Sequence, residues 1–152
     1  MRSAIVARTI DTCSLLREVS GSRNGASVLF VGTVRDLNDG SAVSGIDYSA
    51  YATMAERELA EIVREASSRW GTDDIVVEHR IGTLEVADAS VVIAVAHPHR
   101  DEAYQASRYV IEELKKRLPI WKREHYLDGR SEWVAQGAPT ESSGSHTEVA
   151  GR

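Results

Sequence analysis

The sequence predicts one domain of the α+β class with a mostly antiparallel sheet. Its 152 residues are 42% hydrophobic and 27% charged, which is the size and composition of a protein with a substantial core. Three stretches carry apolar residues at helical spacing, whereas the apolar runs between them are short and come in consecutive pairs joined by tight turns. Such pairs favour antiparallel strands over repeated strand–helix–strand units.

Seven strands and three helices are predicted in order along the chain. The strands are short apolar or alternating runs, at residues 3–8, 26–35, 44–51, 74–83, 89–97, 120–127 and 131–135. The first helix begins after the N-cap residue Asp11 and ends near Val19. The second helix begins at a capping-box pattern, Thr53-x-x-Glu56, and ends at Trp70.

The third helix has a clear end, because Pro119 cannot continue it and pushes Leu118 away from helical angles. Its apolar stripe consists of Ala103, Ala106, Val110, Leu114 and Leu118. Asp128-Gly129 predicts a tight turn between the last two strands. The predicted domain covers residues 1–136, and the small, polar residues 137–152 are expected to form a disordered tail.

Composition argues against several classes of protein. No apolar run approaches the roughly 20 residues that span a bilayer, and no secretory signal is recognisable. The single cysteine, Cys13, fits a reducing cytoplasm, and we expect it to be a core residue of the first helix. Zinc-ligand spacing, a P-loop and a dinucleotide fingerprint are all missing, so neither a metal nor a cofactor is predicted. A net charge of −5 and few aromatic residues argue against an RNA- or nucleotide-binding domain.

A basic segment stands out on this acidic chain. Between Lys115 and Arg130 there are six basic and two acidic side chains, a net charge of +4. Lys115 belongs to the last turn of the third helix and Lys122 to the strand beyond Pro119, so both ammonium groups can reach one pocket. This pattern predicts a local site for an anionic ligand. The alternative is that these cations favour a helix C-terminus and a solvated strand face.

Further candidates lie where strands end. Arg35 closes the strand at 26–35 and opens a polar loop that looks mobile enough to act as a lid, and arginine there suits a phosphate or carboxylate. His99 and Arg100 join the strand at 89–97 to the third helix and suggest a ligand edge. The alternative for this pair is a capping histidine beside a solvent-exposed arginine. His79 alternates in register with apolar residues, so we expect a structural histidine facing the core.

Several stretches together resemble one family, the catalytic (large) subunit of molybdopterin synthase, called MoaE. They appear in family order, cover roughly residues 3–135 and are GASVLFVGTVRD (25–36), YSAYATMAERELAEI (48–62), EHRIGTLEV (78–86), HPHRDEAYQA (97–106) and LKKRLPIWKRE (114–124). Any one stretch is weak evidence. The set, and above all the last run with its lysine, proline, tryptophan and second lysine, is specific.

The resemblance implies a fold, a reaction and partners. The family fold is an α/β hammerhead, and its members convert cyclic pyranopterin monophosphate into molybdopterin by installing the two dithiolene sulfurs. The sulfur arrives as a thiocarboxylate on the C-terminal glycine of a small ubiquitin-like (MoaD-like) partner. Two catalytic subunits form a homodimer within a heterotetramer. The implied activity is therefore a cytoplasmic sulfurtransferase of molybdenum cofactor biosynthesis.

The resemblance also implies site residues. The essential lysines of the family match Lys115 and Lys122. The substrate-contacting positions match Thr33, Val34, Arg35, His99, Arg100, Lys115, Lys122, Arg123 and Glu124.

Two departures and one alternative function accompany the resemblance. Many relatives carry a basic residue shortly after the tryptophan that matches Trp133, whereas this chain continues Val-Ala-Gln-Gly, so one anion contact is missing or supplied by Arg130. Lys116 follows Lys115 directly, and the helical stripe does not decide which amine points inward. The alternative is a non-catalytic anion-binding or regulatory module on the same scaffold. A decayed copy should have lost one of the residues Lys115, Lys122, Arg35 and Arg100, and all four are retained.

Overall fold

The computed structural model describes residues 1–135, so the predicted tail at 137–152 lies outside the described residues. The elements, in chain order, are β1 (Arg2–Val6), α1 (Thr12–Val19), β2 (Ala26–Thr33), β3 (Leu37–Asn38), β4 (Ser41–Ala50), α2 (Ala52–Trp70), β5 (Ile75–Arg80), β6 (Gly82–Glu85), β7 (Ala89–His97), α3 (Arg100–Arg117), β8 (Ile120–Tyr126) and β9 (Ser131–Ala135). The predicted α+β class with mostly antiparallel strands is confirmed: within residues 1–135, β1 and β5 form the one parallel pair.

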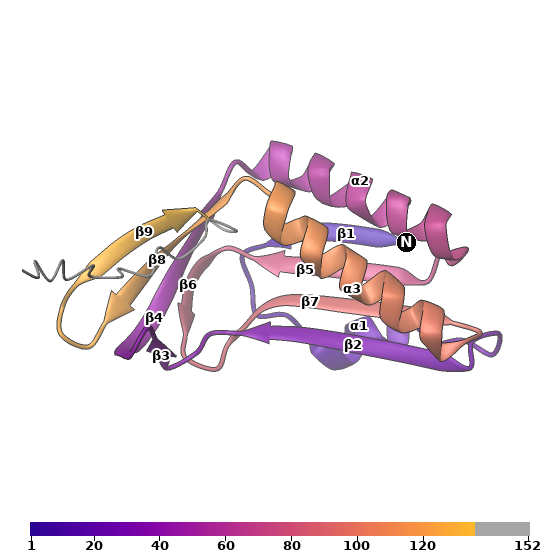
Figure 1. Cartoon of the computed structure of the whole chain (residues 1–152), viewed down its shortest axis with the longest axis horizontal. Coiled ribbons are helices and arrows are strands. Elements are labelled where there is room, and N and C mark those ends of the chain that lie inside the picture. Colours follow the sequence, from indigo (N-terminus) through magenta and orange to yellow (C-terminus); the bar gives the residue numbers. More distant parts are fainter. Residues whose placement is uncertain (136–152) are drawn as a thin grey trace, which may run out of the picture.

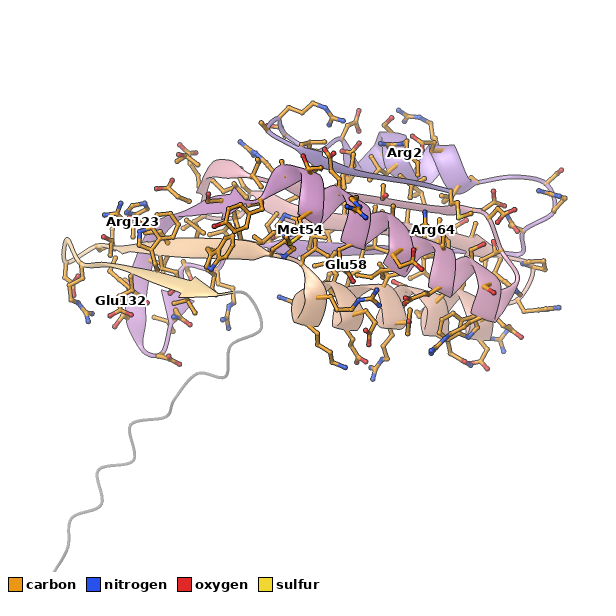
Figure 2. The ribbon with its side chains drawn as sticks, turned by 90° about the horizontal axis from the view of Figure 1, so that it is seen from above. Arg2, Met54, Glu58, Arg64, Arg123 and Glu132 are labelled. Carbon is orange, nitrogen blue, oxygen red and sulfur yellow. The ribbon has the colours of Figure 1, made fainter. Side chains whose placement is uncertain are left out.

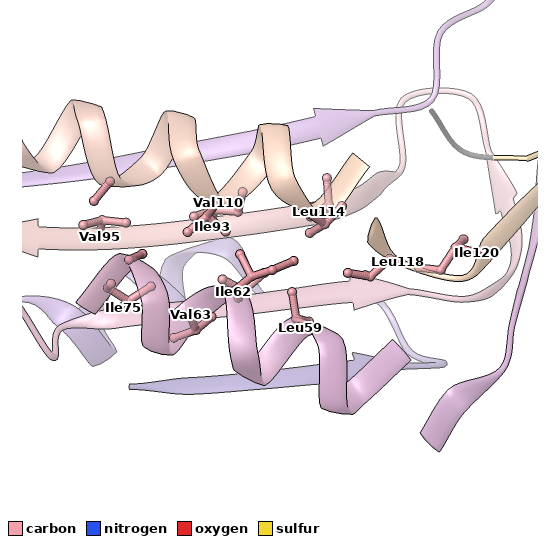
Figure 3. Close-up of a cluster of buried hydrophobic side chains, with 14 residues drawn as sticks. Leu59, Ile62, Val63, Ile75, Ile93, Val95, Val110, Leu114, Leu118 and Ile120 are labelled. Carbon is pink, nitrogen blue, oxygen red and sulfur yellow. The ribbon is translucent and has the colours of Figure 1, made fainter. Parts of the chain in front are cut away.

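The main sheet has the strand order β1-β5-β7-β2 and is covered on both faces. Helices α2 and α3 pack on one face and α1 on the other (Figure 1). Because side chains alternate along a strand, β7 supplies Ile93 to the cluster under α2 and α3 and Val92 to the cluster under α1. The larger cluster includes Leu59 of α2 and Leu114 of α3, both fully buried (Figure 3).

A second sheet, with the order β3-β4-β8-β9, stands beyond the end of the main sheet at which α3 finishes (Figure 1). Strand β6 pairs with residues 45–48 of β4, which pair with β8 along their other edge. The chain passes from β5 of the main sheet to β6 of the second sheet at Gly82. The φ of 97° at this residue is a backbone conformation that favours glycine. The pocket described below lies at this junction.

Three element predictions are corrected by the structure. The single strand predicted at 74–83 is two strands, β5 and β6, which belong to different sheets. The expected mobile loop after Arg35 is a short hairpin, β3 with the start of β4, closed by a turn with positive φ at Asp39 and Gly40. The capping box is also wrong, because α2 begins at Ala52 and its N-cap position, Tyr51, makes no side-chain cap.

The other helix boundaries follow the local chemistry. Asp11 caps α1 as predicted, since its carboxylate accepts a hydrogen bond from the Ser14 backbone amide at 3.0 Å. Helix α3 ends at Arg117, and Leu118 before the proline is extended with φ −71° and ψ 129°. Among residues 1–135, no helix is both long and apolar enough to cross a membrane.

Candidate active site

A pocket of about 160 Å³ opens at the junction of the two sheets. Its wall on the main sheet comes from the ends of β2 and β7, and its wall on the second sheet comes from β3, β4 and β8. The charged residues that line it are Arg35, Lys115, Lys122 and Glu124. Three cations and one carboxylate therefore converge from three separate segments of the chain.

The break at Pro119 brings the two lysines together. Lys115 is on the last turn of α3, and Lys122 is on β8, where it pairs with Tyr48 of β4. The neighbouring Lys116 turns away and its ammonium lies 3.5 Å from the Glu113 carboxylate on its own helix. The helical direction of each side chain thus answers the question that the sequence left open, because Lys115 and not Lys116 lines the pocket.

The environment of Lys115 changes its proton affinity. Although the residue as a whole is exposed, partial burial of its amine and the positive charges of Lys122 and Arg35 all lower the pKa of Lys115 below its ordinary value. A lysine in this state holds more neutral amine near neutral pH than a surface lysine does. It is therefore suited to act as a base or a nucleophile.

Lys122 is fixed by an ion pair. Its Nζ lies 3.0 Å from Oε1 of Glu124, a carboxylate that is only 4% exposed. Burial raises the pKa of Glu124, but hydrogen bonds from Tyr126, Lys122 and Asn38 outweigh that effect and leave the pKa below its ordinary value. Glu124 is thus ionised, and it holds the Lys122 ammonium at the pocket wall.

The residues before Arg35 are positioned by backbone contacts. The ladder between β2 and β7 shifts register between Gly32 and Thr33, a bulge-like irregularity just before the pocket residues. The Val34 amide donates to the Asp88 carbonyl at 3.0 Å, and its carbonyl accepts from Ala87. Val34 is buried, so it shapes the wall, whereas Thr33 and Arg35 are exposed at the pocket.

Three of the expected site residues lie elsewhere in the single chain. His99 and Arg100 line a separate depression at the start of α3, together with Gly25 and Pro98. Helix α3 has 18 residues, so its two ends are separated by about 25 Å. Arg123, on the second sheet (Figure 2), points to the other face of β8 from Lys122 and Glu124. Its guanidinium donates hydrogen bonds to Ser131 and lies 5.7 Å from the centre of the Trp133 ring.

His79 is fully buried beneath the pocket, as its register predicted. Its Nδ1 lies 3.0 Å from the Arg80 carbonyl oxygen. Its ring packs edge-to-face with that of Tyr48, a pocket residue, with 5.4 Å between the two ring centres. Burial, opposed by the Arg80 hydrogen bond and reinforced by the charge of Lys115, lowers the pKa of His79 to about 4. The imidazole is therefore neutral at physiological pH.

Sequence reasoning missed two residues that contact the site, Asn38 and Tyr126. Both donate hydrogen bonds to Glu124, at 2.6 Å each. A signal for Tyr126 was present, because it stands two residues beyond Glu124 on a strand and so shares its face. No comparable signal marked Asn38, whose position depends on the fold of the hairpin.

The prediction that Cys13 belongs to the core is wrong. The thiol is exposed on α1, where Leu15 and Val19 take the buried positions. Helix α1 lies on the opposite face of the main sheet from α3, so the thiol is remote from Lys115 (Figure 1). In the part of the chain that is described, no group of three His, Cys, Asp or Glu side chains is arranged to hold a metal ion.

The arrangement as a whole favours binding and activating an anionic substrate. Arg35 offers a planar donor for phosphate or carboxylate, Lys122 offers a fixed ammonium, and Lys115 offers an amine of reduced basicity. The remaining lining includes apolar side chains such as Phe30 and Val91, which lower the local dielectric and strengthen these interactions.

Comparisons with known proteins agree on one family. The family model described as "MoaE protein" matches residues 5–117. A molybdopterin synthase catalytic subunit from Halalkalibacterium halodurans is 43% identical over 141 residues, which cover 93% of this chain and 90% of that protein. The crystal structure of molybdopterin synthase from Staphylococcus aureus matches with a TM-score of 0.81 and 40% identity, over 86% of this chain and 95% of the other.

A more distant structure shares the fold alone. It is a complex of subunits 1 and 2 of molybdopterin-converting factor from Helicobacter pylori, with a TM-score of 0.70 and 22% identity. The match covers 93% of this chain and 97% of that one. The two-sheet architecture is thus kept even where most side chains have changed.

Proposed function

Because the chain belongs to the MoaE protein family, we propose that its pocket transfers sulfur to cyclic pyranopterin monophosphate and forms the dithiolene of molybdopterin. The sulfur donor in this proposal is the thiocarboxylated C-terminus of a small ubiquitin-like partner. The observation that carries the proposal is the convergence of Arg35, Lys115 and Lys122 in one pocket. The pterin carries a phosphate and the partner's C-terminus carries an anionic thiocarboxylate, so a pocket with several cations suits both reactants.

The two lysines are assigned different roles. The lowered pKa of Lys115 supports acid–base or covalent assistance at the partner's terminal carbonyl or at the pterin carbon. The Lys122 ammonium, held by Glu124, is assigned to stabilise negative charge that develops during transfer. Arg35 is assigned to the phosphate of the pterin.

The partner subunit follows from the sulfur chemistry. A sulfurtransferase that carries its own sulfur needs an activated thiolate at the site, and Cys13 is on the far side of the main sheet. The sulfur must therefore be delivered by another molecule. The H. pylori complex of similar fold contains a second subunit, which supports a carrier of this kind. We place the reaction in the cytoplasm, in keeping with the single free thiol.

We also propose that the chain acts as a homodimer that pairs through β2. This strand is an edge of the main sheet and, despite its apolar sequence, has no fully buried residue in the single chain. Val31 is 37% exposed, and Tyr104 of the adjoining α3 is 63% exposed. An apolar edge strand of eight residues is an unusual surface for a monomer to leave uncovered.

Pairing of this kind would complete the pocket. Arg35 is two residues beyond the end of β2. Gly25 directly precedes the start of β2 and lies beside Pro98, next to His99 and Arg100. A twofold axis through an antiparallel β2–β2 pair places the start of one strand beside the end of the other. His99 and Arg100 of the second copy then approach the pocket of the first, which accounts for their distance from Lys115 within one chain.

The test of the proposed reaction is reconstitution. The protein is mixed with a thiocarboxylated ubiquitin-like partner and the cyclic pterin, and dithiolene product is measured by mass. Lys115→Ala and Lys122→Ala should each lower the rate by about 100-fold or more. Lys116→Ala is the matched control, because Lys116 is the exposed neighbour that pairs with Glu113, and it should keep full activity. Undiminished transfer by Lys115→Ala would refute the assignment.

The dimer has a separate test based on complementation. Lys115→Ala and Arg100→Ala should each be inactive, but an exchanged mixture contains heterodimers with one intact pocket. Equal mixing should therefore restore about a quarter of the original activity. If size-exclusion chromatography shows dimers that exchange subunits and activity does not return, shared pockets are ruled out.

A further inference from the structure

The two oxygens of the Glu124 carboxylate have different partners. Oε1 faces the Lys122 ammonium at 3.0 Å. Oε2 accepts one hydrogen bond from the Tyr126 hydroxyl at 2.6 Å and another from the Asn38 side-chain amide at 2.6 Å. Asn38 and Tyr126 also contact each other at 3.2 Å, so these residues form a closed network. One oxygen is thereby anchored, and the other is left free for the lysine.

The anchor determines where Lys122 points. A carboxylate on a flexible glutamate side chain can rotate, and a lysine paired with it follows that rotation. Two donors on one oxygen remove this freedom, and the burial of Glu124 makes the hydrogen bonds stronger than they would be in water. The Lys122 ammonium is then held at the pocket wall before substrate arrives, which is the condition for effective charge stabilisation.

Asn38 connects this network to the hairpin that forms one pocket wall. Strand β3 pairs with β4 through only two residue pairs, Leu37 with Ala42 and Asn38 with Ser41. Leu37 lines the pocket and is 52% exposed, so the hairpin has little apolar burial of its own to hold it. The hydrogen bond from Asn38 to Glu124 joins β3 to β8 over the intervening strand β4, shortly after the segment that carries Arg35.

We propose that Asn38 and Tyr126 are positioning residues of the sulfur-transfer site, which hold Glu124 so that it fixes the Lys122 ammonium toward the substrate. The inference rests on the proposed function for its kinetic consequence only. Because Asn38 belongs to β3, the placement of Lys122 also depends on the position of the β3–β4 hairpin.

Asn38→Asp is the sharpest test, because it keeps the shape of the side chain and replaces the donor by an acceptor that repels Glu124. Tyr126→Phe removes the other donor and little else. The matched control is Asn24→Asp: Asn24 donates to the Asp74 carboxylate at 2.7 Å, in a pair of the same chemistry outside the pocket. Both test variants should lower kcat, by about tenfold for loss of one hydrogen bond at a charged group, with KM changed less than twofold.

Two measurements separate positioning from a merely structural role and need no substrate. The carboxyl carbon of Glu124, followed by NMR, should titrate at higher pH in Asn38→Asp and Tyr126→Phe than in the unmodified chain, because donors that favour the ionised form are lost. Lys122, followed by acetic anhydride labelling and mass spectrometry, should react several-fold faster, whereas labelling of Lys116 in the same sample stays constant. Asn24→Asp should change neither measurement.

The outcomes assign failure to one hypothesis or the other. An unchanged Glu124 titration with unchanged Lys122 labelling in both variants overturns the positioning role. So does an Asn38→Asp effect on kcat that is equally large in a Glu124→Gln background, since the effect then does not pass through Glu124. If the unmodified chain itself makes no dithiolene, the proposed function fails, while the titration and labelling still decide whether Asn38 and Tyr126 control Lys122.

Discussion

Mild acid should destabilise the fold through one buried side chain, His79. An ordinary histidine has a pKa of 6.5, whereas burial holds the pKa of His79 at about 4 in the folded chain. Between these values the unfolded chain binds a proton at His79 and the folded chain does not, so stability falls as pH decreases through the window. From pH 7 to pH 5, this residue should reduce the free energy of unfolding by about 2 kcal/mol.

The assay is urea denaturation at pH 7 and pH 5 for the unmodified chain and for His79→Asn. Asparagine cannot titrate, and its amide can still donate to the Arg80 carbonyl that His79 Nδ1 contacts. The variant should be less stable at pH 7, because a ring is lost from the core, but it should lose about 2 kcal/mol less on acidification. For a chain of this size that difference amounts to about 4–8 °C in Tm.

The control for this prediction is Val77→Ala, which truncates a fully buried side chain without changing a titratable group and should lose as much stability on acidification as the unmodified chain. Stopping at pH 5 limits the contribution of carboxylates such as Glu78 and Glu124, whose pKa values are below normal and which lose their stabilising effect only at lower pH. Equal losses of stability in the unmodified chain and in His79→Asn would refute the reasoning.

Three further predictions concern packing and the free thiol. Leu59→Ala should lower the free energy of unfolding by about 2–5 kcal/mol in urea denaturation, because the side chain is fully buried. Met54→Ala, on the outer face of the same helix (Figure 2), should change the free energy of unfolding by no more than about 0.5 kcal/mol. Equal losses in the two variants would contradict the assigned faces of α2. Gly25→Ala should destabilise the chain by about 1–3 kcal/mol, since its Cβ would lie 2.6 Å from the Pro98 carbonyl oxygen, and a Tm equal to that of the unmodified chain would show that the backbone adjusts freely. Cys13→Ser should keep full sulfur transfer and nearly full stability, and a folded but inactive variant would overturn delivery of sulfur by a partner.

The sequence predicted helices and strands well where neighbouring residues alone determine where an element begins or ends. Pro119 ended α3, Asp11 capped α1, and the apolar run at 89–97 matched β7 residue for residue. The predictions failed where tertiary pairing decides. Residues 74–83 read as one strand, yet a positive φ at Gly82 lets the chain leave the main sheet there and pair with β4.

The candidate site was predictable only in part for the same reason. Lys115 and Lys122 are close in sequence across a defined break, so their convergence could be argued from the chain itself. Arg35 joins them through the packing of one sheet against another, which residue spacing does not encode. His99 and Arg100 were expected beside the lysines, and the length of α3 separates them. Contacts between two copies of the chain cannot be predicted from the spacing of residues along one of them.

The last turn of α3 sends three consecutive cations in three directions. Lys115 enters the pocket, Lys116 faces Glu113, and the Arg117 guanidinium binds Glu58 and Glu65 of α2 at 2.6 and 2.7 Å. Each residue of an α-helix turns the next side chain by about 100°. Deleting one residue within α3 would therefore present a different amine to the substrate while leaving the composition of the segment almost unchanged. Activity therefore depends on the direction in which each basic side chain leaves the helix as well as on its identity. A variant with one residue deleted from α3 could keep every lysine of the segment and still be inactive.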